Sequence, residues 1–157
     1  MSQTDANAGI KIVAQNRRAT HDYFVEDRFE AGIALTGSEI KSIRAGRVNL
    51  REAYVRAEGR EVFLLNAHIA LYDPAASQNH DPLRARKLLL HKKEIAKLAE
   101  KVQQKGYTIV PLKMYLLKGR AKVEIALAKG KRQYDKRQAI AERDSQREIA
   151  RALGRKG

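Results

Sequence analysis

The chain contains no cysteine and no tryptophan in its 157 residues. Without cysteine it cannot form disulfides, use a catalytic thiolate or build a zinc site on Cys, and this composition suits a cytoplasmic protein. It also lacks a lipid-anchor motif and a long apolar run, and its first residues, MSQTDANAG, lack the apolar stretch of a signal peptide. We therefore expect a cytoplasmic protein with no membrane association.

Acidic residues are scarce relative to basic ones. The chain has 18 Asp and Glu against 32 Lys and Arg, which gives a formal net charge of +14 and a pI near 10.2. Such a charge attracts polyanions, of which nucleic acid is the commonest inside a cell. The hydrophobic fraction of 43% is close to that of ordinary globular proteins, so a packed core is still expected.

Several segments have the alternating pattern of β-strands. Residues 10–16 form a candidate strand, and residues 21–37 predict one long strand or two short ones. Two apolar runs on either side of Glu58-Gly59-Arg60 indicate a hairpin. Residues 121–128 alternate strictly, which predicts a strand with one buried face that follows a turn at Lys118-Gly119-Arg120.

Helices are predicted at two places. SEIKSIRAG, residues 38–46, has Ser38 as its expected N-cap and Gly46 as its end. Residues 91–106 carry the clearest helical stripe, which consists of Ile95, Leu98, Ala99 and Val102. Residues 73–87 contain two prolines and few apolar side chains, so we expect a loop there.

These elements predict one mainly β domain over residues 10–130, preceded by a disordered segment, 1–9. Six or seven short antiparallel strands with tight turns are typical of a small barrel or a sandwich. Pro111 cannot donate a hydrogen bond to a neighbouring strand, so it should lie at an edge or a bulge.

Basic residues concentrate in two regions. Residues 84–105 hold eight Lys and Arg against two Glu, and residues 129–157 hold ten against four Asp and Glu. In the tail, Arg143, Arg147, Arg151 and Arg155 recur every four residues. With so few apolar residues, the tail over 131–157 is expected to be disordered alone and helical on a polyanionic surface. A solvated tail that only raises solubility is the simpler alternative, and a membrane-surface helix is disfavoured because large apolar anchors are missing.

No pattern typical of an enzyme stands out. GSEIKSIRAG lacks the spacing of a phosphate-binding loop, and the four histidines show no i, i+4 pair. His21 and Asp22 could form an acid–base pair, but neighbours on a strand point to opposite faces.

Two further groups of polar residues have simpler explanations than catalysis. Asp73, His80 and Asp81 could touch a metal, although Asp-Pro sequences are ordinary turn chemistry, which we favour. Glu30 and Glu39 could be a carboxylate pair, or they could accept hydrogen bonds from bases or ribose hydroxyls. We expect no metal and no cofactor.

An ordered set of stretches covers nearly the whole chain from Ile10 onward. They are NRRATHDYFVEDRFEAGIALTGSEIKSIRAG, DPLRARKLLLHKKEI, GYTIVPLKMYLLKGRAKVEIALAKGKRQYDKR and the basic tail. In this order they resemble the bacterial SsrA-binding (SmpB) family. The resemblance implies a closed barrel of the oligonucleotide/oligosaccharide-binding type, with two to three packed helices and no enzymatic activity. It also implies binding to the tRNA-like domain of transfer-messenger RNA (tmRNA), and delivery of alanyl-tmRNA to the empty A site of a stalled ribosome together with elongation factor Tu and GTP.

The resemblance also assigns roles to particular residues. Glu30, Leu89 and Lys122 match family positions for tmRNA binding, and Glu39 and Lys41 are added with weaker support, while Arg86 and Lys87 are expected phosphate contacts from their charge. His21 matches a position near the decoding centre, and GKRQYDKR, residues 130–137, resembles the junction between barrel and tail. The tail would lie in the vacant mRNA channel against small-subunit ribosomal RNA. Its candidate contacts are Lys131, Arg132, Asp135, Lys136, Arg137, Arg143, Arg147 and Arg151. The tail lacks the aromatic residue that the family carries near the position of Ser145.

Three other functions remain open from the residues alone. The barrel could bind structured RNA without preference for tmRNA, in which case salt would control affinity. The chain could be a nuclease that uses His21, Asp22 or a carboxylate pair. The tail could instead bind an acidic protein partner.

Overall fold

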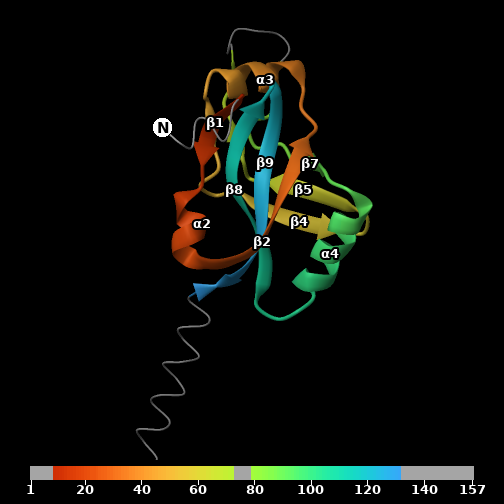
Figure 1. The fold of residues 1–157 in the computed structure, drawn as a ribbon. Coiled ribbons are helices and arrows are strands. Elements are labelled where there is room, and N and C mark those ends of the chain that lie inside the picture. The colour runs from red at the N-terminus through yellow and green to blue at the C-terminus, as the bar shows by residue number, and fades with distance from the viewer. Residues whose placement is uncertain (1–8, 73–78, 132–157) are drawn as a thin grey trace, which may run out of the picture.

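The computed structural model describes residues 9–72 and 79–131, whose path is drawn in Figure 1. The predicted tail beyond Lys131 and the first eight residues lie outside the described residues. Within the described part, seven antiparallel strands form one sheet in the order β1-β8-β4-β5-β7-β2-β9. These strands are β1 Ile10–Gln15, β2 Tyr23–Ile33, β4 Tyr54–Glu58, β5 Glu61–Leu65, β7 Arg86–Leu89, β8 Tyr107–Leu117 and β9 Arg120–Gly130.

An additional pairing between β8 and β9 closes six of these strands into a ring, which leaves β1 attached outside it along β8. The expected mainly β barrel is therefore confirmed, with a ring of six strands. Two short strands, β3 Val48–Asn49 and β6 His68–Ile69, pair separately. Among residues 9–72 and 79–131, three helices accompany the barrel: α2 Arg17–Asp22, α3 Gly37–Arg44 and α4 Lys92–Val102.

The predicted tight turns are confirmed. β4 and β5 pair up to Glu58 and Glu61, so the hairpin turns at Gly59-Arg60, and Gly59 has a positive φ of 57°. Lys118 and Gly119 both have positive φ, at 49° and 80°, between β8 and β9. Two consecutive positive φ angles match the twist of the flanking strands, so this turn allows the long hairpin to close. Pro111 lies at a bulge, since the β8–β9 register shifts between Pro111 and Lys113.

Two elements differ from expectation. Residues 17–22 form the helix α2 where a strand was predicted from residue 21, and residues 86–89 form β7 where the loop was expected to continue to residue 87. In β7, Arg86 and Leu88 point inward while Lys87 and Leu89 are exposed. The strand alternates as strands do, but an inward arginine hides the apolar pattern on which the prediction relied.

Both faces of the second half of β9 are buried. Val123, Ile125 and Leu127 belong to the main core, as the alternation predicts. Ala126 and Ala128 were expected on an exposed face, yet both are fully buried in a second cluster with Ala19 of α2. Small side chains here let α2 lie close against the sheet, which places this helix beside the ends of β2 and β9.

The two longer helices close the barrel core. Ile43 of α3 and Leu98 of α4 are fully buried in the main cluster, and Figure 1 shows the two helices at different sides of the barrel. The helix over 91–106 is confirmed as α4. The N-cap of α3 is Thr36 and not Ser38, because Thr36 and Glu39 form a reciprocal capping box. This box draws the Glu39 carboxylate inward.

Candidate nucleic-acid interface

Five residues on neighbouring strands line up across the outside of the barrel. Leu89 on β7 is opposite Gly32 on β2, and Gly32 is opposite Lys122 on β9. Lys122 is opposite Tyr115 on β8, which is opposite Ile12 on β1. Directly opposed residues of antiparallel strands share a face of the sheet. We call this set, Leu89, Gly32, Lys122, Tyr115 and Ile12, the outer row.

The outer row combines exposed apolar ends with a basic middle. Leu89 is 53% exposed and Ile12 is 44% exposed, although both are large hydrophobic residues. Gly32 has no side chain, and the Leu89 side chain lies against it, since a Cβ at position 32 would lie 3.3 Å from the Leu89 Cβ and 3.6 Å from its Cδ1. Neighbouring strands are about 4.8 Å apart, so Leu89 and Lys122, which are two strands apart, are separated by about 10 Å. An exposed apolar side chain and a lysine at this separation suit a flat group that carries negative charge nearby.

Glu30 lies next to the outer row, two residues before Gly32 on β2. Its carboxylate accepts a hydrogen bond from the Tyr115 hydroxyl. Burial of the phenol, together with this bond to Glu30, raises the pKa of Tyr115, so the hydroxyl remains a donor. Glu30 is exposed, and Tyr115 therefore fixes an outward carboxylate beside the outer row.

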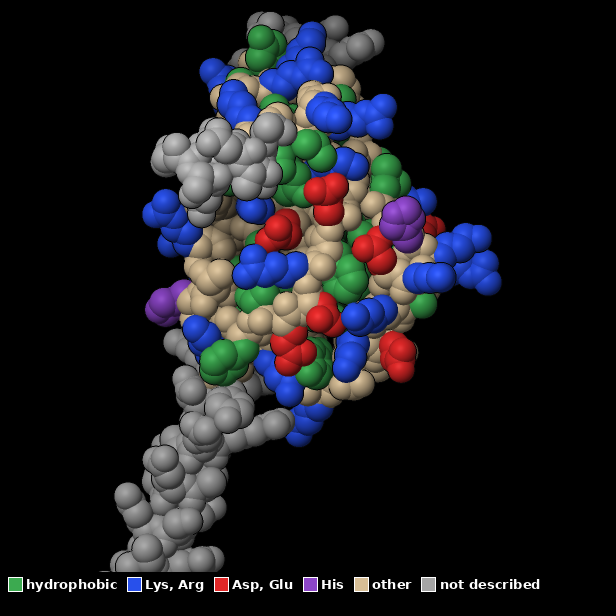
Figure 2. All heavy atoms as spheres, in the orientation of Figure 1, with side chains coloured by type: hydrophobic (Ala, Val, Ile, Leu, Met, Phe, Trp, Pro, Cys, Tyr) green, Lys and Arg blue, Asp and Glu red, His purple; other side chains and the backbone are tan. Residues whose placement is uncertain are grey.

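A second carboxylate on the same face is already neutralised. Glu124 is directly opposite Glu30. Arg28 Nη1 lies 3.3 Å from its Oε1, and Lys113 Nζ lies 3.8 Å from its Oε2. Figure 2 shows Asp and Glu side chains interspersed among Lys and Arg on this side of the molecule. Glu30 is thus the carboxylate of this pair that has no cationic partner within the described residues.

The expected RNA contacts Glu39 and Arg86 lie in the interior. Both side chains have 0% relative exposure, and Arg86 Nε donates to Glu39 Oε2 at 2.6 Å. Arg86 also donates to three backbone carbonyls, those of Ala67, Asp81 and Pro82. Neither side chain reaches the surface, so neither can make the expected contact with RNA. Both residues instead stabilise the fold. Sequence alone does not distinguish an inward arginine from an outward one.

The Glu39 carboxylate joins three parts of the chain. Besides Arg86, it accepts from Arg84 Nη2 at 2.6 Å and from the Thr36 backbone N–H at 2.8 Å. Burial raises the pKa of Glu39, but the hydrogen bonds from Arg84, Thr36 and Arg86 outweigh it and lower the pKa to about 2. The cluster holds α3 against β7, the strand that carries Lys87 and Leu89.

The remaining predicted cations of this region are on the surface. Lys41 is exposed and lies 5.9 Å from the centre of the Tyr72 ring. Lys87 is also exposed, and its Nζ is 3.8 Å from Glu61. Surface pairs of this kind contribute little to stability, so both cations are available to a polyanion.

The predicted ribosome-facing residues His21 and Lys131 come together near α2. Lys131 Nζ donates to the carbonyl of Thr20 at 3.1 Å and lies over the Phe24 ring, 5.2 Å from its centre. The His21 side chain is 88% exposed. Arg132, Asp135, Lys136, Arg137, Arg143, Arg147 and Arg151 lie outside the described residues.

His21 and Asp22 touch, contrary to the geometry expected of a strand. Both lie in α2, and His21 Nδ1 is 2.9 Å from Asp22 Oδ1. This bond lowers the pKa of Asp22. Asp22 also accepts from Arg18, so each of its oxygens already has a donor, and its lowered pKa makes it a weak base.

His80 and Asp81 have structural partners. His80 is buried between the Ser38 hydroxyl, 2.9 Å from Nδ1, and the Ile69 carbonyl, 2.8 Å from Nε2. Asp81 accepts from the Leu83 backbone N–H at 2.9 Å, which is the turn chemistry expected. Within residues 9–72 and 79–131, no group of three or more His, Asp or Glu side chains could hold a metal ion.

A closed antiparallel barrel with a mixed apolar and cationic outer row, in a strongly basic chain, defines a β-barrel RNA-binding protein. A family model described as "SmpB protein" matches residues 13–155. The chain belongs to the SmpB family, a family of non-catalytic RNA-binding proteins.

Relatives agree over nearly the full length. The SsrA-binding protein of Symbiobacterium thermophilum is 60% identical over 149 residues, which cover 94% of each chain. That of Caldicellulosiruptor bescii is 54% identical over 153 residues, with 98% of this chain and 97% of the relative covered. A solved structure described as "tmRNA-SmpB: a journey to the center of the bacterial ribosome" is 50% identical, with a TM-score of 0.64, and the match covers 79% of this chain and 85% of that one.

In the part of the chain that the structure describes, no helix has both the length and the apolar character needed to cross a bilayer.

The buried carboxylate gives a first prediction. Glu39→Gln removes the charge that balances the buried Arg86, so we expect the free energy of unfolding at pH 7 to fall by about 3 kcal/mol. Denaturant unfolding measures this difference. Glu58→Gln, which alters an exposed pair with Arg56, is the matched control and should change stability by less than about 1 kcal/mol. Equal effects of the two substitutions would contradict the assignment.

The same carboxylate predicts a pH dependence. The pKa of Glu39 is lower in the folded state than its ordinary value of 4.5, so its contribution is present above pH 4.5 and is lost as pH falls toward 2. Over that window, the wild-type chain should lose about 3 kcal/mol more stability than Glu39→Gln. Parallel stability curves for both proteins between pH 5 and about pH 2 would refute this.

Proposed function

We propose that this chain binds tmRNA through the outer row and Glu30 and acts with it on the ribosome in trans-translation. Membership of the SmpB family and the likeness to a tmRNA–SmpB structure support this function. The main observation in support of this binding surface is that Leu89, Gly32 and Lys122 lie opposite one another on adjacent strands. These residues come from three distant parts of the sequence, and the barrel gives them one surface.

The chemistry of this surface suits RNA. An exposed leucine can pack against an unstacked base, and a lysine beside it can contact the phosphate that follows that base. A carboxylate accepts hydrogen bonds from base amino groups or 2′-hydroxyls, which would otherwise be difficult to recognise on a basic protein. Tyr115 holds the Glu30 carboxylate in position for this contact. The exposed Lys41 and Lys87 add charge for further phosphates.

The RNA partner in this proposal is the tRNA-like domain of tmRNA, delivered as alanyl-tmRNA to an empty A site with elongation factor Tu and GTP. His21 and Lys131 would then face the decoding centre. The tail beyond Lys131, with Arg132, Asp135, Lys136, Arg137, Arg143, Arg147 and Arg151, would enter the vacant mRNA channel. What supports this division is the separation of Lys122 from the end of β9 at Gly130, eight residues or about 27 Å at the rise of a strand, together with the basic charge of the tail.

Charge reversal tests the outer row directly. Lys122→Glu should weaken binding to the tRNA-like domain of tmRNA by about tenfold or more, since a phosphate contact becomes a repulsion. Lys93→Glu on α4 makes the same change in net charge on an exposed residue outside the row and is the control. Filter-binding titrations at one salt concentration measure both. If the two variants lose the same affinity, net charge accounts for binding and the proposed surface is wrong.

Deletion of the tail tests whether RNA binding belongs to the barrel and action on the ribosome to the tail. Removing residues 131–157 should leave binding to the tRNA-like domain within about threefold of the full chain, because the outer row is intact, but should stop tagging on stalled ribosomes. Tagging is measured in a reconstituted translation system with an mRNA that lacks a stop codon. A deletion that weakens RNA binding as strongly as Lys122→Glu would contradict the division.

Tyr115→Phe tests whether the hydroxyl acts through Glu30. The variant removes only the donor, so affinity for the tRNA-like domain should fall by about fivefold. In a double-mutant cycle, Tyr115→Phe added to Glu30→Gln should cause little further loss. Additive losses would mean that Tyr115 does not position Glu30. Melting temperatures of the four proteins separate loss of binding from loss of fold.

A further inference from the structure

Two carboxylates lie side by side on the outer face of the barrel, and they differ in their partners. Glu30 on β2 and Glu124 on β9 are directly opposite each other. Side chains at such positions have Cβ atoms about 5 Å apart, and like charges there repel. Arg28 and Lys113 both contact Glu124, whereas the partner of Glu30 within the described residues is the uncharged Tyr115 hydroxyl. The nearby cations are therefore distributed unequally between two neighbouring acids.

A second arginine–glutamate pair in the chain shows what spacing alone produces. Arg56 and Glu58 are two residues apart on β4, and Arg56 Nη1 lies 3.1 Å from Glu58 Oε1. Arg28 and Glu30 have the same spacing on β2, and residues two apart on a strand share a face. At about 3.3 Å per residue, their Cα atoms are about 7 Å apart. Arg28 is therefore within reach of Glu30, yet it pairs with Glu124.

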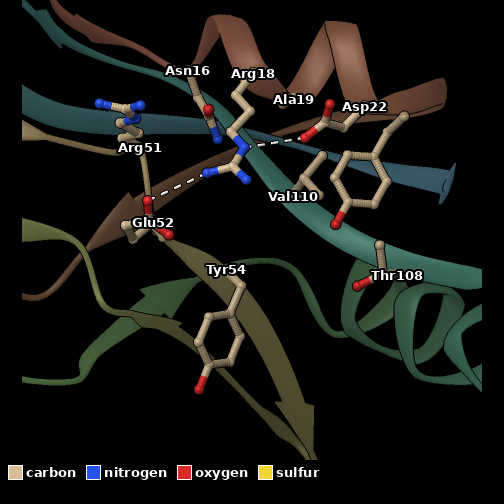
Figure 3. A pocket seen from close by; sticks show the side chains of 11 residues that line it. Asn16, Arg18, Ala19, Asp22, Arg51, Glu52, Tyr54, Thr108 and Val110 are labelled. Atoms are coloured by element: carbon tan, nitrogen blue, oxygen red, sulfur yellow. Dashed lines mark hydrogen bonds and ion pairs between the residues drawn. The ribbon is translucent and has the colours of Figure 1, made fainter. Parts of the chain in front are cut away.

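Carboxylates on the α2 side of the barrel also take a nearby arginine. Arg18 lies between Asp22 and Glu52, at 3.1 Å and 3.3 Å, and Figure 3 shows its guanidinium directed to both acids. Two acids share one cation there. On the outer face the ratio is reversed, because Glu124 takes two cations while Glu30 takes none from the described residues.

The position of Glu124 explains why it attracts both cations. Its side chain is 21% exposed, against 59% for Arg28 and 32% for Lys113. Partial burial reduces screening by water, so its attraction for a cation is stronger than that of an exposed carboxylate. Lys113 is also directly opposite Glu124 on β8. Glu124 is therefore the favoured partner for cations on this face.

We propose that Glu124 is a positioning residue that holds Arg28 away from Glu30. A free carboxylate accepts hydrogen bonds from base amino groups or 2′-hydroxyls, and it repels a phosphate that arrives at the same place. An ion pair with Arg28 would remove both effects. Glu124 thereby contributes to specificity for RNA through its neighbour, and this inference rests on the contact between Glu30 and RNA in the proposed function.

The direction of the change in affinity tests this role. Glu124→Gln removes a negative charge, so general attraction to RNA should increase by about twofold, which an unstructured oligouridylate measures. Binding to the tRNA-like domain of tmRNA should instead weaken by about threefold, because Arg28 then forms a surface ion pair with Glu30. Tighter binding of both RNAs would overturn the proposal.

Removal of the released arginine tests whether it causes the loss. Glu124→Gln combined with Arg28→Gln should restore affinity for the tRNA-like domain to within about twofold of the original chain. The double variant has one positive charge fewer than Glu124→Gln, so net charge alone predicts weaker binding. A double variant that does bind more weakly than Glu124→Gln would overturn the proposal.

Glu58→Gln is the matched control. It removes the same charge from an arginine pair of the same spacing, outside the proposed surface. It should change the affinities for both RNAs in the same direction, by about twofold or less. If it weakens binding to the tRNA-like domain as Glu124→Gln does, the effect does not depend on Glu30 and the proposal is wrong.

A measurement without RNA tests the exchange of partners itself. NMR of the full-length, ¹⁵N-labelled chain follows the side-chain Nε–H resonance of Arg28. Glu30→Gln should shift this resonance more in the Glu124→Gln background than in the original chain, because Arg28 contacts Glu30 only when Glu124 is neutral. Equal shifts in the two backgrounds would overturn the proposal.

The affinity of Glu30→Gln separates this inference from the proposed function. If that variant binds the tRNA-like domain as tightly as the original chain, the proposed contact of Glu30 with RNA is wrong, and the role of Glu124 fails with it. If Glu30→Gln weakens binding while Glu124→Gln tightens it, the proposed function stands and the inference about Glu124 alone is wrong.

Discussion

The pairing between β8 and β9 is the interaction on which the rest of the barrel depends. β8 also pairs with β1 and β4, and β9 also pairs with β2, so this one hairpin joins the two ends of the sheet into a ring. Its inward residues, Met114, Val123 and Ile125, fill the core, and its outward residues include Tyr115 and Lys122. The same pairing register therefore determines both the packing of the interior and the order of side chains on the outer row. The Lys118-Gly119 turn and the bulge at Pro111 set that register.

The buried Glu39–Arg86 pair adds a second constraint. β7 is a short strand, and on its own it would have little to hold it in the ring. Arg86 ties it to the carbonyls of Ala67 and Pro82, while Glu39 ties it to the capped start of α3. Charges in such a pair gain little over a hydrophobic contact, but a broken pair is costly, so the arrangement favours one position of the strand. Leu89 and Lys87 are presented on the outside of β7 as a result.

Much of the fold could be predicted from local patterns. Each of these elements could be predicted because its pattern depends only on near neighbours in the sequence. They are the strand over 121–128, the turns at Gly59 and Gly119, and the helix α4. β7 was missed because its inward residue is an arginine, whose partner, Glu39, is distant in the sequence. The alignment of Leu89, Gly32 and Lys122 depends on two strand pairings, that of β7 with β2 and that of β2 with β9. Resemblance to a family indicated Leu89 and Lys122, but only the pairing register could show that they lie on either side of Gly32.

The central claim is that the barrel recognises one RNA by shape and chemistry and that net charge alone does not account for binding. A salt-series titration of the full chain against the tRNA-like domain of tmRNA and a size-matched tRNA tests this most directly. The account predicts selective binding to the tRNA-like domain that persists at moderate salt, with a preference over tRNA that changes little as salt rises. Equal affinities that decline together with salt would contradict it, since the charge of +14 would then explain binding without the outer row.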